Sequence, residues 1–127
     1  MTKCETTHFS RRELQCHCGC GQCEMDQAFL VRLEQLRRAF GKPMRLSSAY
    51  RCPDYNARIS HTGNTGPHTT GRAVDVLVSG EDAYRLVRLA LEHGFTGIGI
   101  SQKGSHEKRF IHLDDLEGET RPWVWSY

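Results

Sequence analysis

Apolar residues recur at helical spacing in two stretches of the chain. The first stretch runs over residues 27–40, between Asp26, a favourable N-cap, and Gly41, a residue type that commonly ends helices. Its apolar positions share one helical face: Phe29, Leu30, Leu33, Leu36 and Phe40. This spacing predicts an amphipathic helix that packs the shared face against a core.

The second stretch predicts a helix over residues 81–93, ended by Gly94. Its apolar stripe consists of Tyr84, Val87 and Leu91. These positions are three and four residues apart, which is the spacing of neighbours on one helical face. We therefore expect this stripe to face the core.

Four shorter segments have the composition of β-strands: residues 44–49, 73–79, 96–101 and 109–115. Successive side chains of a strand point to opposite faces. The second segment therefore has Ala73, Asp75 and Leu77 on one face and Val74, Val76 and Val78 on the other. The order of the elements predicts an α+β fold, with a small, mainly antiparallel sheet and flanking helices on one side.

The length of 127 residues indicates one compact domain over residues 1–127, with residues 1–25 as a cysteine-rich, irregular N-terminal wrap. The chain has 17 Lys and Arg against 15 Asp and Glu, and the resulting net charge of +2 is too small to suggest nucleic-acid binding. No apolar run approaches the roughly 18 residues of a membrane span. The first residues lack the apolar stretch of a signal peptide, so we expect synthesis in the cytoplasm.

Two histidines and one aspartate stand out as candidate chemistry. His68 lies in a polar, glycine-rich loop, and Asp75 lies in the most apolar predicted strand, where a buried carboxylate is costly unless a cation compensates it. That cation is either an arginine, Arg51 or Arg72, or a metal ion. His112 lies between apolar residues on another predicted strand. Two imidazoles and a carboxylate are a ligand set that holds a catalytic zinc ion and leaves one position for water.

Cysteines form a second cluster, with four of them inside eight residues: Cys16, Cys18, Cys20 and Cys23. They are candidate ligands of a second, structural zinc ion, with His17 or Cys52 as a substitute for one of them. The alternatives are disulfides formed after export and free thiols. The spacing differs from the paired C-x-x-C motifs of zinc knuckles, so the sequence leaves all three open.

Several segments, taken in order, resemble the motifs of the zinc D-Ala-D-Ala peptidase family. They are SSAYRCPDYN (47–56), PHTTGRAVDV (67–76), GIGIS (97–101), FIHLD (110–114) and the terminal WSY. This LAS-type group includes lysostaphin-like endopeptidases, D-Ala-D-Ala carboxypeptidases and the hedgehog signalling domain. The N-terminal HFSRREL and CHCGCG segments look like the branch found in bacteria and often in phages. The resemblance implies a hedgehog/D-Ala-D-Ala peptidase-like fold for nearly the whole chain.

The resemblance also implies roles for individual residues. The family's zinc ligands match His68, Asp75 and His112. Arg51 matches an arginine that holds a substrate carbonyl or carboxylate and stabilises the oxyanion, and Ser48 begins the segment that contains it. Tyr50 directly precedes Arg51. We therefore expect Ser48 and Tyr50 to line the substrate site with Arg51.

The general base stays open at this point. Several relatives carry Glu, Asp or His three residues before the last zinc histidine, but the residue there is Arg109, which cannot act as a base near neutral pH. Asp114 is the first choice, because alternate strand positions put it on the same face as His112. Glu107 and His106, which lie further upstream, are the alternatives.

The C-terminal aromatic residues Trp123, Trp125 and Tyr127 have two explanations. They form a wall of a substrate groove, or they pack under the sheet. The other histidines, namely His8, His17, His61 and His93, are expected at the surface.

The candidate ligand set and the resemblance together imply a zinc-dependent metallopeptidase; the resemblance implies that it hydrolyses a peptide bond in bacterial peptidoglycan, as a carboxypeptidase or an endopeptidase. Peptidoglycan is anionic, which suits a slightly basic protein. We expect a monomer that acts on the cell wall, in the periplasm or in a virion, for example as a phage lysis enzyme. The alternative is a non-catalytic, zinc-containing module that binds the wall or a protein.

Overall fold

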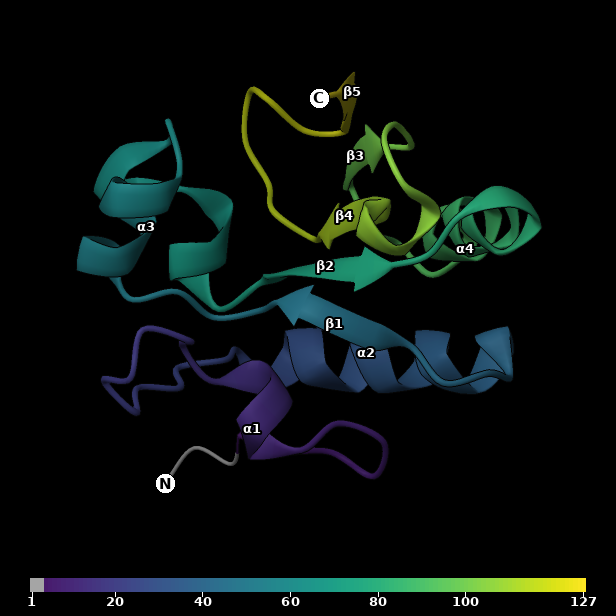
Figure 1. Cartoon of the computed structure of the whole chain (residues 1–127). Helices are drawn as coiled ribbons and strands as arrows, with labels where there is room; N and C mark the ends of the chain where they lie inside the picture. Colours follow the sequence, from purple (N-terminus) through teal and green to yellow (C-terminus); the bar gives the residue numbers. More distant parts are fainter. Residues whose placement is uncertain (1–3) are drawn as a thin grey trace.

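The computed structural model describes residues 4–127 and has the predicted α+β architecture (Figure 1). Its centre is a five-stranded sheet in the order β1-β2-β4-β3-β5. The strands are β1 (Arg45–Ser48), β2 (Ala73–Leu77), β3 (Gly97–Ser101), β4 (Phe110–Asp114) and β5 (Trp123–Ser126). Every neighbouring pair is antiparallel except β3 and β5, which run parallel. The prediction of a small, mainly antiparallel sheet is confirmed.

The register of the central strands gives the sheet two different faces. Asp75 of β2 lies opposite His112 of β4, and His112 lies opposite Gly99 of β3. Because side chains alternate along a strand, Asp114 is on the same face as His112. The other face carries buried apolar residues: Val74, Val76, Ile98, Ile111 and Leu113. One face is therefore suited to a polar site and the other to the core.

The apolar face of the sheet shares one core with two long helices, α2 (Gln27–Phe40) and α4 (Gly80–Glu92). In Figure 1, α2 lies along the sheet beside β1. The Asp26 carboxylate caps α2 by accepting a hydrogen bond from the backbone N–H of Phe29 (2.9 Å), and Gly41 ends the helix in a left-handed conformation. The stripe predicted for this helix is buried throughout. No helix within residues 4–127 has the length and apolar character needed to cross a bilayer.

The stripe predicted for α4 is wrong. Tyr84 is 79% exposed and Leu91 is 61% exposed. The buried face of the helix consists of Ala83, Leu86, Leu89 and Ala90. Both sets of residues repeat at intervals of three and four, so periodicity alone could not distinguish them.

Two α-helices and one strand were not predicted: α1 (Arg11–Leu14), α3 (Pro53–Ile59) and β5. A capping box of Ser10 and Glu13 supports α1 inside the N-terminal wrap. At α3 we expected a turn, but a proline at the first helical position loses no helical hydrogen bond and favours a helix start. The end of α3 borders the cavity on the polar face of the sheet, whereas α2 shares the core on the apolar face, so the helices are not confined to one side of the sheet.

The N-terminal wrap contributes to the core, although its sequence is mainly polar. Phe9, Leu14 and Met25 are buried in the same cluster as the long helices. The backbone N–H of Tyr50 donates a hydrogen bond to the carbonyl of Leu14 (3.1 Å). The wrap is thereby attached to the segment that follows β1, which also carries Arg51.

Candidate metal centre

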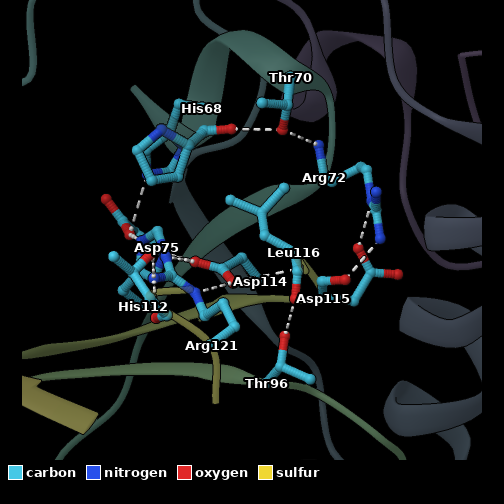
Figure 2. Close-up of polar contacts among 12 residues, drawn as sticks. His68, Thr70, Arg72, Asp75, Thr96, His112, Asp114, Asp115, Leu116 and Arg121 are labelled. Atoms are coloured by element: carbon cyan, nitrogen blue, oxygen red, sulfur yellow. Dashed lines mark hydrogen bonds and ion pairs between the residues drawn. The ribbon is translucent and has the colours of Figure 1, made fainter. Parts of the chain in front are cut away.

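Two imidazoles and one carboxylate meet on the polar face of the sheet (Figure 2). His68 comes from the short 3₁₀ helix η2 (Pro67–Thr70), Asp75 from β2 and His112 from β4. The Oδ1 atom of Asp75 lies 3.2 Å from Nε2 of His68 and 3.0 Å from Nδ1 of His112. The potential ligand atoms of the three residues all lie within 4.8 Å of one another. The three residues selected from the sequence therefore form one cluster.

The outer nitrogen of each imidazole has a partner that only accepts hydrogen bonds. Nδ1 of His68 lies 2.7 Å from the carbonyl oxygen of Ala49. Nε2 of His112 lies 2.7 Å from Oδ2 of Asp114. When each ring is neutral and carries its proton on this outer nitrogen, the lone pairs are on His68 Nε2 and His112 Nδ1. Both lone pairs belong to the nitrogens that face Asp75.

This arrangement fits a metal ion. Histidines that bind metals usually donate their second ring N–H to a carbonyl or carboxylate, which fixes the tautomer and the ring. Tetrahedral zinc with bonds of about 2.0–2.1 Å places its ligand atoms roughly 3.3 Å apart. The distances from Asp75 Oδ1 to the two imidazoles, 3.2 and 3.0 Å, are close to that spacing. The cluster provides three ligands and therefore has the donor set of an open zinc site.

Asp75 remains a carboxylate in this setting. Burial raises the pKa of its carboxyl, but the nearby imidazoles of His68 and His112 outweigh burial and hold the pKa below its ordinary value. Its second oxygen, Oδ2, lies 3.6 Å from Nη2 of Arg51. The sequence left a metal ion or an arginine as the cation that compensates Asp75. In the structure Oδ1 faces the two imidazoles of the candidate metal site and Oδ2 faces Arg51, so both cations have a place.

Arg51 is held in place beside the cluster. Its Nε donates to Oγ of Ser48 (2.9 Å), and its Nη1 donates to Oδ1 of Asn56 (3.0 Å). The side chain is mostly buried, at 14% exposure, yet it lines the cavity next to the cluster. Ser48 thus orients Arg51 and is not itself a lining residue.

Asp114 lies behind His112 and is fully buried. Both of its oxygens accept hydrogen bonds from Arg121, at 2.9 Å from Nε and 2.8 Å from Nη2. Burial raises the pKa of Asp114, but Arg121 and His112 outweigh it and hold the pKa below its ordinary range. Burial lowers the pKa of His112, while Asp114 and Asp75 raise it more. The aspartate is therefore a charged acceptor that fixes His112.

Two glycines in β3 leave space for this network. A Cβ at Gly97 would collide with the carboxylate of Asp114, and a Cβ at Gly99 would lie 2.7 Å from Nε1 of Trp125. The Trp125 ring packs beside His112, with ring centroids 5.1 Å apart. The GIGIS segment therefore alternates between apolar residues for the core and glycines for the site.

A cavity of about 760 Å³ opens next to the three candidate ligands. One wall is aromatic and consists of Phe110, Trp123, Trp125 and Tyr127. The opposite wall comes from the end of α3 and the loop after it: Ile59, Ser60, His61 and Thr62. Of the two explanations for the C-terminal aromatic residues, the structure supports the groove wall.

Three residues expected at the site lie elsewhere. His106 and Glu107 are exposed on the 3₁₀ helix η3 (His106–Lys108) and border a separate hollow with Lys42 and Asp82. Tyr50 is buried, and its hydroxyl donates to Glu24 (3.2 Å) in the N-terminal wrap. None of the three is among the residues that line the cavity.

Three residues in or beside the cavity have roles at the site that the sequence did not predict. His61, expected at the surface, lines the cavity, and Arg121 does so as well while it pairs with Asp114. Asn56 is buried and orients Arg51. Glycines and polar residues surround His61, and the segment before β5 has no periodicity, so these roles depend on contacts between distant parts of the chain.

The cysteines are arranged differently from the first expectation. Cys23 forms a disulfide with Cys4, with Cα atoms 6.2 Å apart. The sulfurs that gather within 4.8 Å of one another belong to Cys16, Cys18, Cys20 and Cys52. Cys52 thus takes the place that we first gave to Cys23, and His17 is exposed outside the group.

Comparison with known families gives one match that covers most of the chain. The family model of Peptidase M15 matches residues 7–114, a span that includes the three candidate ligands and Arg51. Comparison with curated proteins finds no significant match.

Proposed function

The chain belongs to the peptidase M15 family, and from this premise we propose that it is a zinc metallopeptidase that cleaves a peptide bond in bacterial peptidoglycan. The observation that carries the proposal is the cluster of two buried imidazoles and the Asp75 carboxylate, in which each imidazole has an acceptor at its outer nitrogen, beside an open cavity. The family is zinc-dependent, and this ligand set suits zinc. The cell wall, the periplasm or a virion is the proposed site of action, with the monomer as the active form.

His68, Asp75 and His112 would hold the ion. When bound, zinc supplies the Lewis acid that activates a water molecule and polarises a peptide carbonyl. The carbonyl of Ala49 and the carboxylate of Asp114 keep the two imidazoles in the tautomers and orientations that binding requires. Asp114 thus has a positioning role in this proposal, in place of the base role that we first expected.

Arg51 would stabilise the negative charge that develops on the carbonyl oxygen. Ser48 and Asn56 hold its guanidinium, which therefore needs little reorganisation during the reaction. Its Nη2 atom lies 3.6 Å from Oδ2 of Asp75, which puts a fixed positive charge at the edge of the ligand set. A charge held in this way acts on the transition state more than on the unreacted substrate.

We assign the proton transfer to His61. Apart from the three ligands and two arginines, the ionisable side chains that line the cavity are His61 and Tyr127. Burial raises the pKa of Tyr127, so its hydroxyl stays protonated near neutral pH and does not act as a base. An imidazole can take a proton from water and return it to the leaving amine. Asp114 is less suited, because Arg121 and His112 engage both of its oxygens.

The aromatic wall formed by Phe110, Trp123, Trp125 and Tyr127 supports a peptide substrate. Aromatic side chains offer large, rigid surfaces for an extended chain and keep polar tips for hydrogen bonds. The cavity volume of about 760 Å³ is in the range of sites that hold ligands of several residues. Peptidoglycan stems and cross-links are short peptides of this kind, and both carboxypeptidase and endopeptidase cleavage are compatible with this cavity.

One observation favours a second function, a zinc-containing module that binds a wall peptide without cleaving it. Among the described residues that line the cavity, Asp75 is the only carboxylate, and it belongs to the ligand set. Many zinc peptidases use a free carboxylate or imidazole for proton transfer. If His61 does not serve, the site would bind peptides without turning them over.

A hydrolysis assay tests the proposal. The purified full chain, before and after chelator treatment, is incubated with isolated peptidoglycan and with short peptides ending in D-Ala-D-Ala, and newly released amino groups are counted. We expect release that chelation abolishes and added zinc restores. The matched variant His106→Ala, an exposed histidine outside the cavity, should behave as the parent protein. Zinc binding without hydrolysis of any wall substrate would support the binding module instead.

A further inference from the structure

A second group of metal-ligating side chains lies outside the proposed active site. Cys16, Cys18 and Cys20 follow α1 in the N-terminal wrap, and Cys52 immediately precedes α3. The four sulfurs lie within 4.8 Å of one another, and none of them is in a disulfide. We propose that these four thiolates bind a structural zinc ion. The inference goes beyond the proposed function and does not depend on it.

The distances between the sulfurs match a tetrathiolate site. The Sγ atom of Cys18 lies 3.5 Å from that of Cys16 and 3.7 Å from that of Cys52. A tetrahedral zinc ion with zinc–sulfur bonds of about 2.3 Å places its sulfurs about 3.8 Å apart. A disulfide needs sulfurs about 2.05 Å apart. The group is therefore spaced for a shared ion.

The surrounding backbone favours negatively charged sulfur. The backbone N–H of Cys52 donates to Sγ of Cys16 (3.3 Å), and the N–H of Gln22 donates to Sγ of Cys20 (3.4 Å). Hydrogen bonds to ligand atoms of this kind stabilise thiolates and orient them toward a metal. Gly19 and Gly21 have positive φ values of 95° and 75°, which side-chain-bearing residues rarely adopt. These turns bring the sulfurs of a C-x-C-x-C segment to one side.

The donor set indicates which ion would bind. Four thiolates are soft ligands, which select zinc or iron and discriminate against Ca²⁺ and Mg²⁺, ions that prefer oxygen. Four protein ligands also leave no position for substrate, which is typical of structural zinc and not of catalytic zinc. Zinc is the redox-inert member of these candidates, and it would serve purely to hold the chain.

The position of the site explains what such an ion would hold. In Figure 1 the loop after α1 reaches toward the start of α3. The ion would join this loop to Cys52, the residue that follows Arg51. The wrap has few apolar residues between 15 and 24, so packing alone gives it little stability. A metal link would supply stability there and fix the backbone that carries Arg51.

The experiment measures zinc content and zinc–sulfur bonds in the purified full chain. We expect two zinc ions per chain, one with an X-ray absorption shell of sulfur at about 2.3 Å. His68→Ala should retain the sulfur-bound ion alone. Cys20→Ser, at an exposed position, should remove one zinc ion per chain together with the sulfur shell. The double variant Cys4→Ser/Cys23→Ser removes the disulfide and should keep both ions.

If a variant does not fold, measurements on the parent protein alone still test whether the four cysteines bind a metal ion. Replacement of zinc by Co²⁺ should produce strong thiolate-to-metal charge-transfer absorption in the parent chain. A parent protein without a sulfur shell or this absorption would overturn the site. A disulfide among the four cysteines, found by peptide mapping under non-reducing conditions, would also overturn it, and iron in place of zinc would overturn the identity of the ion.

Discussion

The two ligand clusters of this chain are built in different ways. His68, Asp75 and His112 stand mainly on neighbouring strands, are buried, and border a cavity. The four-cysteine cluster joins a turn-rich loop to the start of a helix, and one of its members is exposed. Three ligands beside a cavity suit an ion that does chemistry, and four ligands suit an ion that holds a fold. The number of ligands and their access to substrate therefore distinguish a catalytic from a structural metal site, whereas the mere presence of ligands does not.

The support behind the ligands differs as well. Each imidazole of the first cluster has an acceptor on its outer nitrogen, and Arg121 in turn fixes the Asp114 acceptor. In the second cluster, backbone N–H groups point directly at the sulfurs of Cys16 and Cys20. Histidine needs a side chain or a carbonyl to select its tautomer, whereas thiolate needs positive dipoles to stabilise its charge.

The largest effect should come from removing a ligand of the first cluster. His68→Ala deletes the imidazole whose Nε2 faces Asp75, so we expect hydrolysis to fall below detection while the sulfur-bound zinc remains. Amino-group release and metal analysis on the same preparation check this. Cys20→Ser is the matched change in the four-cysteine cluster. If this variant loses one zinc ion but still hydrolyses substrate, the lost ion is structural and the remaining ion is catalytic. Full activity of His68→Ala would contradict the comparison.

The next largest effects should fall on the rate without loss of metal. His61→Ala removes the group to which we assign proton transfer, and we expect a decrease in kcat of about 10²–10⁴-fold. Zinc content should stay as in the parent protein, because His61 is not a ligand. Steady-state kinetics on a wall peptide, with His106→Ala as control, measures the change. An unchanged kcat would show that His61 does not transfer the proton, and Asp114 would then be the first residue to test for this role.

Arg51→Gln is expected to lower kcat by about 10²–10³-fold, since it removes the fixed charge at the developing oxyanion. The amide keeps part of the hydrogen bonding to Ser48 and Asn56, so the fold should persist. The readout is kcat against KM, together with zinc content. A loss seen in KM alone would mean that Arg51 binds substrate and does not act on the transition state.

A smaller change should separate the two roles considered for Asp114. Asp114→Asn weakens the acceptor of His112 Nε2 and breaks the pairing with Arg121, so we expect zinc affinity to fall about 10–100-fold. Competition with a chelator measures the affinity, and Asp54→Asn at an exposed position is the control. If affinity stays unchanged while kcat collapses even with zinc in excess, Asp114 is the general base after all.

The last effect is on the free energy of unfolding and not on catalysis or metal binding, and it concerns how the N-terminal wrap is held without a metal ion. Burial raises the pKa of Glu34, but hydrogen bonds from Thr6 and His8 outweigh burial and lower it to about 2. A lowered pKa stabilises the fold above the ordinary value of 4.5, and this contribution disappears as the pH falls from 4.5 toward 2. Glu34→Gln should therefore cost about 2–3 kcal/mol at pH 7 and progressively less in acid. Denaturant unfolding at several pH values measures it, and a cost that does not depend on pH would be inconsistent with this origin.

The sequence was most informative where one local pattern determined the structure. Alternation in β2 and β4 placed Asp75 and His112 on one face, and the pairing register then set them opposite each other. The stripe of α2 was correct because its flanking cap and stop residues fixed the helix. For α4 two stripes had equal spacing, and only packing against the sheet and α2 selected Leu86 over Leu91.

The sequence was least informative where distant segments meet. The choice of Cys52 over Cys23 in the sulfur cluster depends on how the wrap lies against α3. Asp114 was selected for its strand face, but its surroundings depend on Arg121, which precedes a strand that was not predicted. His61 gave no signal of its own, because it reaches the cavity only through the position of α3.

Anomalous diffraction at the zinc edge, from crystals of the zinc-loaded protein, tests the central claim most directly. We predict a peak bounded by His68 Nε2, His112 Nδ1 and the Asp75 carboxylate, on the side that faces the cavity. Zinc bound elsewhere with no peak among these three residues, or a His112 ring turned so that Nδ1 faces away from Asp75, would contradict the proposed metal centre.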